Sequence, residues 1–460
     1  MKKAILFFLF TSALALGMQA GVVVKPSQKT GDIKIMNAVN NGPVVSKSTD
    51  QVRDNFQAYK DCGLPFARTH DATFKEGEHV VDISGIFPDF SKDVNDPSSY
   101  DFILTDRYLG NILSAGTQVF FRMGQSIEHK EKKYHIMPPK DYQKWAEICE
   151  HVIRHYNEGW NNGYHWNILY WEIWNEADLD ADDLKWQKDP RTWGGSKEDF
   201  FEFYKVAANH LNRCFPDVKI GGPALAGNEK WADEFLSFMS RNKVEIDFFS
   251  WHIYSTQPSE IAAKADRMRA LMVKYGYGEA ESILNEWNYV HGWTDTYQYS
   301  ADVISSMKGA AFVSAVLSAC QKKPVDMLMY YDARYGTIFN GLFDFYDFQP
   351  RQAYYAMYAW NKLRKLGSEV QATTDEKDVY VTAASDGKRC AILLTRYNED
   401  DNVRGKKTVK VQIEGLEEDA EIISHLTDSS HKYTEVPLTI EDGQIRLSLE
   451  PEAFVMIEIR

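Results

Sequence analysis

The chain has 460 residues, of which 44% are hydrophobic and 26% charged, and its formal net charge is -14. This acidic balance argues against nucleic acid and anionic membrane surfaces as partners, because phosphate binding needs clustered Lys and Arg. The length leaves room for one large domain and one small one.

The first residues have the pattern of a secretory signal peptide. Two lysines precede an apolar run from Ala4 to Leu16, and small residues follow up to Gly21. The run is shorter than the roughly 20 residues that span a bilayer, so a retained membrane anchor is the weaker interpretation. We therefore expect cleavage near Gly21, no stable membrane insertion, and a secreted or periplasmic protein.

From about Ile33 to Lys365 the chain repeats one unit, which consists of a short apolar strand, a polar loop and a periodic helix. Ser196 followed by Asp199 marks one helix start, because the pair can form a capping box. Strands that alternate with helices predict a parallel sheet, and eight repeats predict an α/β fold closed as a (β/α)8 TIM barrel. The expected strands are Ile33–Val39, Leu64–Thr69, Gln118–Met123, Ile168–Trp174, Lys219–Gly222, Ile246–His252, Ser282–Glu286 and Val325–Tyr331.

After Gly367 the sequence changes to short β-rich runs without helical periodicity. Alternation within these runs places apolar residues on one face, which favours a β-sandwich. The predicted domains are a signal peptide over 1–20, a catalytic barrel over 21–366 and a C-terminal β-sandwich accessory domain over 367–460. The expected strands of this last domain are Val379–Ala384, Cys390–Arg396, Thr408–Ile413, Ala420–His425, Gln444–Leu449 and Ala453–Ile459.

The five cysteines lie far apart and form no CxxC pair, so we expect buried thiols and not a disulfide framework. The histidines lack metal-ligand spacing, and no Gly-rich phosphate loop or cofactor fingerprint is visible. The sequence therefore predicts neither a cofactor nor a metal.

The strongest chemical signal is a pair of Asn-Glu dipeptides at the ends of two predicted barrel strands. Glu176 closes the fourth strand and Glu286 the seventh, and barrel active sites lie at such strand ends. Retaining hydrolysis of a glycosidic bond needs two carboxyl groups roughly 5 Å apart, one protonated and one ionised. We expect Glu176 as general acid/base and Glu286, held by cationic and hydrogen-bonding neighbours, as nucleophile. Glu172 lies deeper in its strand and is expected to be an interior barrel residue.

Further motifs lie at or near the ends of the predicted strands. They are Arg68-Thr69-His70, Tyr100-Asp101-Phe102 through Asp106, Trp174-Asn175-Glu176, Gly221-Gly222-Pro223-Ala224, Ser250-Trp251-His252-Ile253-Tyr254 and Asn285-Glu286-Trp287. Together these motifs resemble clan A glycoside hydrolases, and within that clan family 39, whose members include β-xylosidases and α-L-iduronidases. The resemblance covers the whole barrel, and small accessory β-domains are common in the family.

The resemblance implies roles for residues at the strand ends. Arg68 would lie beside Glu286 and keep it ionised, since a guanidinium lowers the pKa of a nearby carboxyl. Asn175 would hold the sugar 2-hydroxyl, whose hydrogen bond strengthens in the transition state. The other implied contacts are His70 to sugar hydroxyls, and His252 and Tyr254 near the nucleophile, with the tyrosine hydroxyl donating to Glu286.

Aromatic residues make up 13% of the chain, and although most must be core, some are expected to stack on sugar rings. The candidate stacking residues, taken as a group, are Trp171, Trp287, Trp293 and Tyr331.

Two departures from the family pattern bear on the site. Ala177 stands where the family usually has proline, which predicts a looser turn after Glu176. The segment 122–126 is polar where the family tends to be aromatic.

The leading prediction is a retaining, exo-acting, β-xylosidase-like enzyme whose partner is a carbohydrate and whose second substrate is water. Arg68, Arg122 and Arg334 together would suit a uronate, which keeps an iduronidase-like activity open, and Asp332 with Arg334 would select the substrate. Two further candidates are an endo-glycanase and a noncatalytic carbohydrate-binding protein of the same fold. A noncatalytic protein is expected to have lost one glutamate, and both are present.

Overall fold

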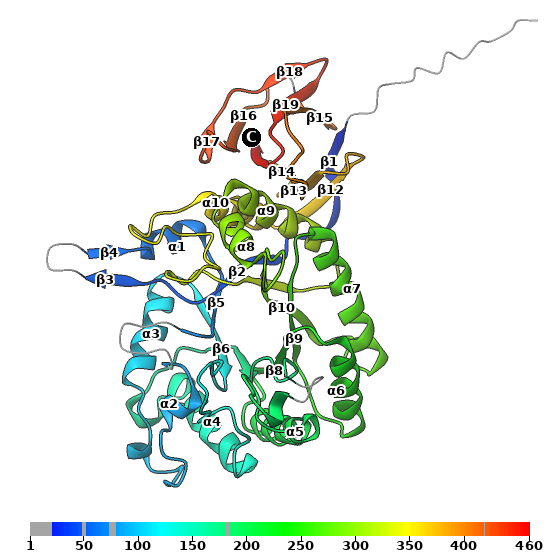
Figure 1. Ribbon diagram of the computed structural model, residues 1–460. Helices are drawn as coiled ribbons and strands as arrows, with labels where there is room; N and C mark the ends of the chain where they lie inside the picture. The colour runs from blue at the N-terminus through cyan, green and yellow to red at the C-terminus, as the bar shows by residue number, and fades with distance from the viewer. Residues whose placement is uncertain (1–20, 48–51, 73–79, 181–184, 418) are drawn as a thin grey trace, which may run out of the picture.

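Eight parallel strands close into a barrel in the computed structural model, which describes residues 21–460 except 48–51, 73–79, 181–184 and 418 (Figure 1). The predicted signal peptide lies outside the described residues. Every expected barrel strand is present, so the predicted TIM barrel is confirmed. In barrel order the strands are β2 (Ile35–Asn40), β5 (Phe66–Thr69), β6 (Gln118–Met123), β7 (Tyr170–Ile173), β8 (Lys219–Leu225), β9 (Phe248–Tyr254), β10 (Glu281–Asn288) and β11 (Met327–Tyr330).

Helices follow the strands and surround the barrel. The predicted capping box at Ser196 and Asp199 is present at the start of α5, where it satisfies backbone N–H groups that the first turn leaves unpaired. The helices are α1 (Phe56–Cys62), α2 (Ile83–Ile86), α3 (Ile103–Ser114), α4 (Tyr142–Asn157), α5 (Lys197–Cys214), α6 (Glu229–Arg241), α7 (Pro258–Lys274), α8 (Tyr297–Ile304), α9 (Met307–Gln321) and α10 (Gln352–Leu366), with short 3-10 turns at Pro97–Ser99, Trp160–Asn162 and Lys185–Gln187.

The barrel interior changes from apolar to polar along the strands. Inward-facing residues recur every second position, so each strand contributes one residue to successive interior layers. The apolar layer supports the polar layer, and the polar layer underlies the catalytic face. The apolar layer contains Ala38, Phe120, Tyr170, Phe248 and Ile283. The polar layer lies two residues further along each strand and contains Asn40, Arg122, Glu172, Ser250 and Asn285, which are fully buried.

A β-bulge interrupts this alternation in β10. Leu284 pairs with Trp251 and Glu286 pairs with His252, the next residue of β9, so Asn285 is an extra residue in β10. Consecutive residues Asn285 and Glu286 therefore both bond side chains inside the barrel.

The accessory domain is one ten-stranded sheet that curls around its own hydrophobic core. The expected domain boundary is wrong at the N-terminus. Strand β1 (Val22–Asp32) pairs antiparallel with β12 (Ser368–Thr374) and parallel with β15 (Lys407–Ile413), and so belongs to this sheet and not to the barrel. The physical reason is that Val22 and Val24 are buried in the core of the curled sheet. Its other strands are β12 (Ser368–Thr374), β13 (Val379–Ser385), β14 (Cys390–Arg396), β15 (Lys407–Ile413), β16 (Ile422–Thr427), β17 (Thr434–Glu435), β18 (Thr439–Glu441), β19 (Gln444–Leu449) and β20 (Ala453–Ile459).

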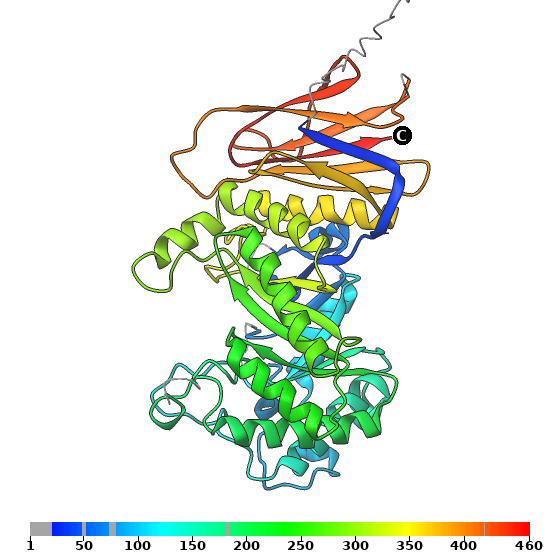
Figure 2. The ribbon, with the colours of Figure 1, turned by 90° about the vertical axis from the view of Figure 1, so that its right-hand side faces the viewer.

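Helices α9 and α10 lie between the barrel and the curled sheet (Figure 2). Lys362 on α10 bonds Glu458 on β20 at 2.8 Å, and Ser314 on α9 bonds Thr395 on β14 at 2.7 Å. The accessory domain therefore packs against the barrel through these two helices.

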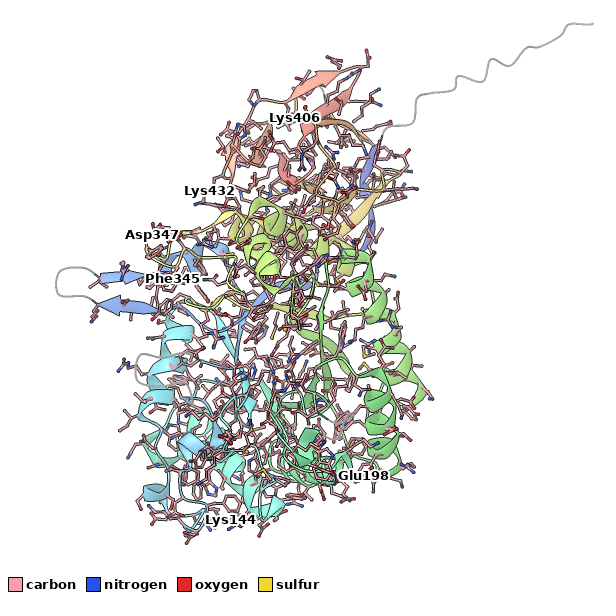
Figure 3. The ribbon with its side chains drawn as sticks, viewed as in Figure 1. Lys144, Glu198, Phe345, Asp347, Lys406 and Lys432 are labelled. Atoms are coloured by element: carbon pink, nitrogen blue, oxygen red, sulfur yellow. The ribbon has the colours of Figure 1, made fainter. Side chains whose placement is uncertain are left out.

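A small hairpin of β3 (Val45–Lys47) and β4 (Val52–Asp54) projects from the barrel beside the loop after β11. Figure 3 labels Phe345 and Asp347 on that loop, and Arg53 of the hairpin donates a hydrogen bond to the Tyr346 carbonyl.

No single helix among the described residues is long and apolar enough to cross a membrane. Helices α8 and α9 would be long enough only as a pair, and they are bent by 78° at their junction. All five cysteines are free thiols, and four are buried while Cys214 is partly exposed.

Candidate active site

The two predicted catalytic glutamates face each other across the mouth of the barrel. Glu176 follows β7 and Glu286 lies in β10, and one carboxylate oxygen from each lies within 4.8 Å of the other and of a His252 nitrogen. Retaining glycosidases have carboxyl groups about 5–5.5 Å apart, whereas inverting enzymes need about 6.5–9.5 Å to admit a water. The observed spacing fits direct attack by a carboxylate.

Glu286 is held by hydrogen-bond donors. Arg68 Nη1 lies 2.7 Å from Glu286 Oε1, and the Tyr254 hydroxyl donates to Glu286 Oε2 at 2.9 Å. His252 Nδ1 lies 3.5 Å from the same Oε2. These are the neighbours that the sequence predicted for a nucleophile, because charge-assisted hydrogen bonds favour the ionised carboxylate.

Arg68 is fully buried and connects several strand ends. Its Nε bonds Glu172 Oε2 at 2.6 Å, its Nη1 also bonds Asn40 Oδ1 at 3.1 Å, and its Nη2 bonds Asn175 Oδ1 at 2.7 Å. Glu172 is the expected interior residue, and burying its charge is tolerable only because it is paired. The guanidinium therefore fixes the positions of Glu286 and Asn175 together.

Glu176 is anchored through its backbone on both sides. Its N–H donates to the Ala224 carbonyl at 2.8 Å, and its carbonyl accepts from the Thr192 hydroxyl at 2.7 Å. Trp174 and Glu176 have φ values of 71° and 51°, a left-handed conformation that costs about 1–3 kcal/mol and persists only where surrounding bonds enforce it. The alanine at 177 therefore does not leave Glu176 loosely held, contrary to the expectation from sequence.

The two carboxyl groups differ in their electrostatic environment. Burial, reinforced by the charge of Asp178, raises the pKa of Glu176 to about 8. Burial also raises the pKa of Glu286, but the charge of Arg68, which is in direct hydrogen-bond contact, opposes that rise. At neutral pH a single proton on this pair resides on Glu176, because Arg68 contacts Glu286 directly.

Two histidines beside the glutamates are neutral. Burial lowers the pKa of His252 to about 4, and its Nδ1 lies 2.9 Å from Glu176 Oε1. Burial and the charge of Arg68 lower the pKa of His70 well below its usual value, and its Nε2 lies 3.6 Å from Glu286 Oε1. Neither ring therefore competes with Glu176 as a proton donor.

A cavity of about 710 Å³ opens above the glutamates and has room for sugar rings. One wall is aromatic, and Trp293 at its rim is 59% exposed and packs edge-to-face on Tyr254 with ring centroids 5.1 Å apart. The predicted substrate residues His70, Tyr254 and Tyr331 line this cavity, and Arg68, Asn175 and His252 are buried around the glutamates. The other lining residues include Asp71, Ile127, His129, Leu179, Arg191, Ala226, Tyr297, Arg334, Thr337 and Phe339.

Two predicted stacking residues lie elsewhere. Trp287 is fully buried and packs on Phe312 and Tyr330, because strand alternation turns it to the face opposite Glu286. Trp171 likewise stacks on Phe121 in the shell outside the barrel. Both predictions are wrong, and of the four candidates Trp293 and Tyr331 line the cavity.

The three arginines do not form the predicted uronate site. Arg122 is fully buried and pairs with Asp82 at 2.9 Å. Arg334 lines the cavity and pairs with buried Asp332 at 3.2 Å. With Arg68 committed to Glu172 and Glu286, the guanidinium groups do not converge on one substrate carboxylate.

The sequence assigned no role to several residues of the site. Asn40 ends β2, and Ser250 and Asn285 both bond Glu172 Oε1. The strand-end rule applied to polar residues would have found Asn40, whereas Ser250 and Asn285 lie inside β9 and β10. Asp71 and Arg191 lie on loops, where no periodic pattern marks them.

A closed (β/α)8 barrel with two facing carboxyls at its strand ends, one paired with arginine, is the arrangement of a retaining glycoside hydrolase. Comparison with known proteins gives the particular family. The model of Glycosyl hydrolases family 39 matches residues 36–382. The chain belongs to this family, which confirms the resemblance inferred from the sequence, and it is a retaining glycosidase.

Individual relatives are distant. A beta-xylosidase from Caldicellulosiruptor saccharolyticus is 25% identical over 362 residues, which cover 72% of this chain and 70% of the relative. The solved glucosidase from Croceicoccus marinus has a TM-score of 0.78 at 21% identity and covers 96% of this chain and 98% of its own. A monomeric beta-xylosidase from Caulobacter crescentus has a TM-score of 0.68 at 16% identity, with coverage of 95% and 99%. At such identities the structural matches establish the fold alone.

Proposed function

We propose that this protein is an exo-acting β-xylosidase-like enzyme that works by double displacement, with Glu176 as acid/base and Glu286 as nucleophile. The observation that carries the proposal is the asymmetry of the pair: the carboxylates lie within 4.8 Å of each other, and Arg68 contacts Glu286. One carboxyl is therefore suited to remain ionised and the other to carry the proton.

In the first step Glu286 Oε attacks the anomeric carbon while the bond to the leaving oxygen breaks. Glu176, with its pKa raised to about 8, gives its proton to that oxygen, and the product is a glycosyl ester on Glu286. The Asn175 side chain is suited to the sugar 2-hydroxyl: Arg68 occupies its oxygen, and Nδ2 has no partner among the residues described. A hydrogen bond there strengthens as positive charge develops on the ring.

In the second step Glu176, now ionised, takes a proton from water, and the water oxygen attacks the anomeric carbon. The ester bond to Glu286 breaks, and the electron pair returns to the carboxylate. Arg68 and Tyr254, both in hydrogen-bond contact with that carboxylate, stabilise its negative charge as the sugar leaves.

The choice of a xyloside is supported by the relative named beta-xylosidase, which covers 72% of this chain. A glucoside is the competing substrate, since the Croceicoccus marinus structure is named a glucosidase. A uronate substrate is not favoured, because Arg68 and Arg122 form ion pairs with buried carboxylates and are not available to bind a substrate carboxylate.

Trapping the glycosyl-enzyme tests the roles directly. A 2-fluoro-xylosyl fluoride should inactivate the protein and label the peptide that contains Glu286, and a label on any other residue refutes the nucleophile assignment. Glu176→Ala should keep slow turnover of dinitrophenyl xyloside, whose leaving group needs no proton, and added azide should speed it with formation of a xylosyl azide. Glu198→Ala, at an exposed glutamate on α5 (Figure 3), is the matched control.

A panel of aryl glycosides tests the sugar, and absence of activity on every pentoside rejects the xyloside proposal. Product size on a xylo-oligosaccharide series distinguishes exo from endo cleavage, because an exo enzyme releases only the terminal sugar.

We also propose export, on the sequence pattern of residues 1–21. Expression of the full chain in a bacterial host should yield a mature protein that begins near Gly21 in the periplasmic or extracellular fraction. An uncleaved protein confined to the cytoplasm contradicts this proposal.

A further inference from the structure

A second cluster of ligand-type side chains lies between helices α4 and α5. Glu150 on α4 and His210 with Cys214 on α5 each offer a ligand atom, and these atoms all lie within 4.8 Å of one another. His210 and Cys214 are four residues apart, so both side chains lie on the same face of α5. We propose that Glu150, His210 and Cys214 form a binding site for a zinc-type divalent transition-metal ion.

The distances fit such an ion. Glu150 Oε2 lies 2.6 Å from His210 Nε2 and 3.6 Å from Cys214 Sγ, and Nε2 lies 3.8 Å from Sγ. Tetrahedral zinc, with bonds of about 2.3 Å to sulfur and about 2.0–2.2 Å to nitrogen and oxygen, sets its ligand atoms about 3.3–3.6 Å apart. The two distances to sulfur are close to these values. The short oxygen–nitrogen distance is a hydrogen bond, which opens when the ion replaces the shared proton.

The donor set also has the right chemistry. Thiolate, imidazole and carboxylate are ordinary zinc ligands, and the two anionic groups balance the charge of a divalent ion. His210 is buried, while Cys214 is partly exposed and lines a cavity of about 260 Å³, from which an ion and water can approach its sulfur.

Neighbouring side chains hold the ligands in place. Arg154 Nε bonds the second oxygen of Glu150 at 2.9 Å, and Gln143 lies 3.0 Å from His210 Nδ1. Metal on Nε2 places a proton on Nδ1, and the Gln143 amide can turn to accept it through its oxygen. Arg213, which also reaches Nδ1 in the metal-free arrangement, is exposed and free to move into solvent.

The cluster lies away from the catalytic cavity. Cys214 is the last residue of α5, and its cavity is lined by residues that precede β7 and β8, at the end of the barrel opposite the strand ends that carry the glutamates. Figure 1 shows α4 and α5 next to each other, and their contact is extensive. A bound ion would therefore link two neighbouring barrel helices without entering the active site.

Cobalt binding to the chelator-treated full-length mature protein tests the proposal. Cobalt bound to a thiolate gives a near-ultraviolet charge-transfer absorption that oxygen and nitrogen ligands do not give. This band distinguishes the new site from the catalytic group Glu176, His252 and Glu286, which contains no sulfur, and Cys214 is the one cysteine of the five that is not buried.

We expect the band in the parent protein with one equivalent of cobalt, and its displacement by zinc. Cys214→Ser should abolish it, and His210→Gln should weaken zinc binding at least tenfold. Glu202→Gln is the control and should leave both unchanged, since Glu202 pairs with Lys205 on α5 and is not a ligand. Thermal unfolding checks that each variant is folded. Absence of the band in the parent protein, or its persistence in Cys214→Ser, overturns the proposal.

Discussion

Replacing Glu176 with glutamine should stabilise the fold, and the gain should grow with pH. The pKa of Glu176 is raised from 4.5 to about 8, with burial as the first cause and Asp178 as the second. Because the folded pKa lies above the unfolded one, the folded state holds the proton more tightly. The stability that this provides is complete below pH about 4.5 and is lost as the pH rises towards 8. Glutamine has no proton to lose, so Glu176→Gln escapes the loss.

The magnitude follows from the same two pKa values. Each pKa unit corresponds to about 1.4 kcal/mol, so between pH 5 and pH 8 the parent protein loses about 3–4 kcal/mol relative to the variant. For a chain of this length, about 1 kcal/mol shifts Tm by about 1 °C.

The assay is thermal unfolding of the parent protein, Glu176→Gln and the control Glu198→Gln at pH 5, 6, 7 and 8. We expect the Tm of Glu176→Gln to gain about 3 °C over the parent across this range, with the control parallel to the parent. A Tm difference that does not depend on pH would refute a raised pKa of Glu176, whatever its sign.

The remaining predictions concern the effects of pH and of single substitutions on catalysis and stability. The kcat/KM for an aryl glycoside substrate should fall about tenfold per pH unit above about pH 8 as Glu176 ionises. If Glu176→Gln shows the same decline at alkaline pH, the decline is due to the ionisation of another group. Arg68→Met should destabilise the protein by about 3–5 kcal/mol, because it leaves Glu172 and Glu286 as unpaired buried charges. The kcat/KM of this variant should also fall by more than its loss of Tm explains. A variant that unfolds at the same temperature as the parent protein contradicts the ion-pair argument. Trp293→Ala should raise KM for an oligosaccharide several-fold at nearly unchanged Tm, whereas Trp287→Phe should lower Tm and leave KM unchanged. The reverse pattern would contradict the placement of Trp293 in the cavity and of Trp287 in the core.

The barrel was predictable because its signal is local and repeated. Each barrel strand is a short apolar run before a polar loop, and β6 was predicted at its observed bounds. The membership of β1 was not predictable in this way. Val22 pairs with Thr374, and nothing in an isolated strand specifies a partner that distant in sequence. Burial of Val22 and Val24 against the curled sheet decides where the strand lies.

The candidate site was predictable to the extent that it follows strand ends. The rule that barrel chemistry lies at carboxyl ends of strands led to Glu176 and Glu286 without knowledge of any distance. The family resemblance added Arg68 and Tyr254. The strand-end rule failed for Trp287, which follows Glu286 immediately in sequence and lies on the opposite face of the strand. The metal-type cluster was missed for a related reason, because Glu150 comes from a different helix than His210, 60 residues away in sequence.

The different protonation states of the two glutamates depend on the polar layer beneath them. The bulge in β10 turns both Asn285 and Glu286 inward, so Asn285 can bond Glu172 while Glu286 reaches Arg68. Without the bulge, strand alternation would allow only one of these consecutive residues to face the barrel interior. Since Arg68 is buried, its charge must be balanced by carboxylates within reach, and Glu172 supplies one of them at 2.6 Å. That pairing fixes the guanidinium in a position where it contacts Glu286 at 2.7 Å, and so makes Glu286 the carboxyl that remains ionised.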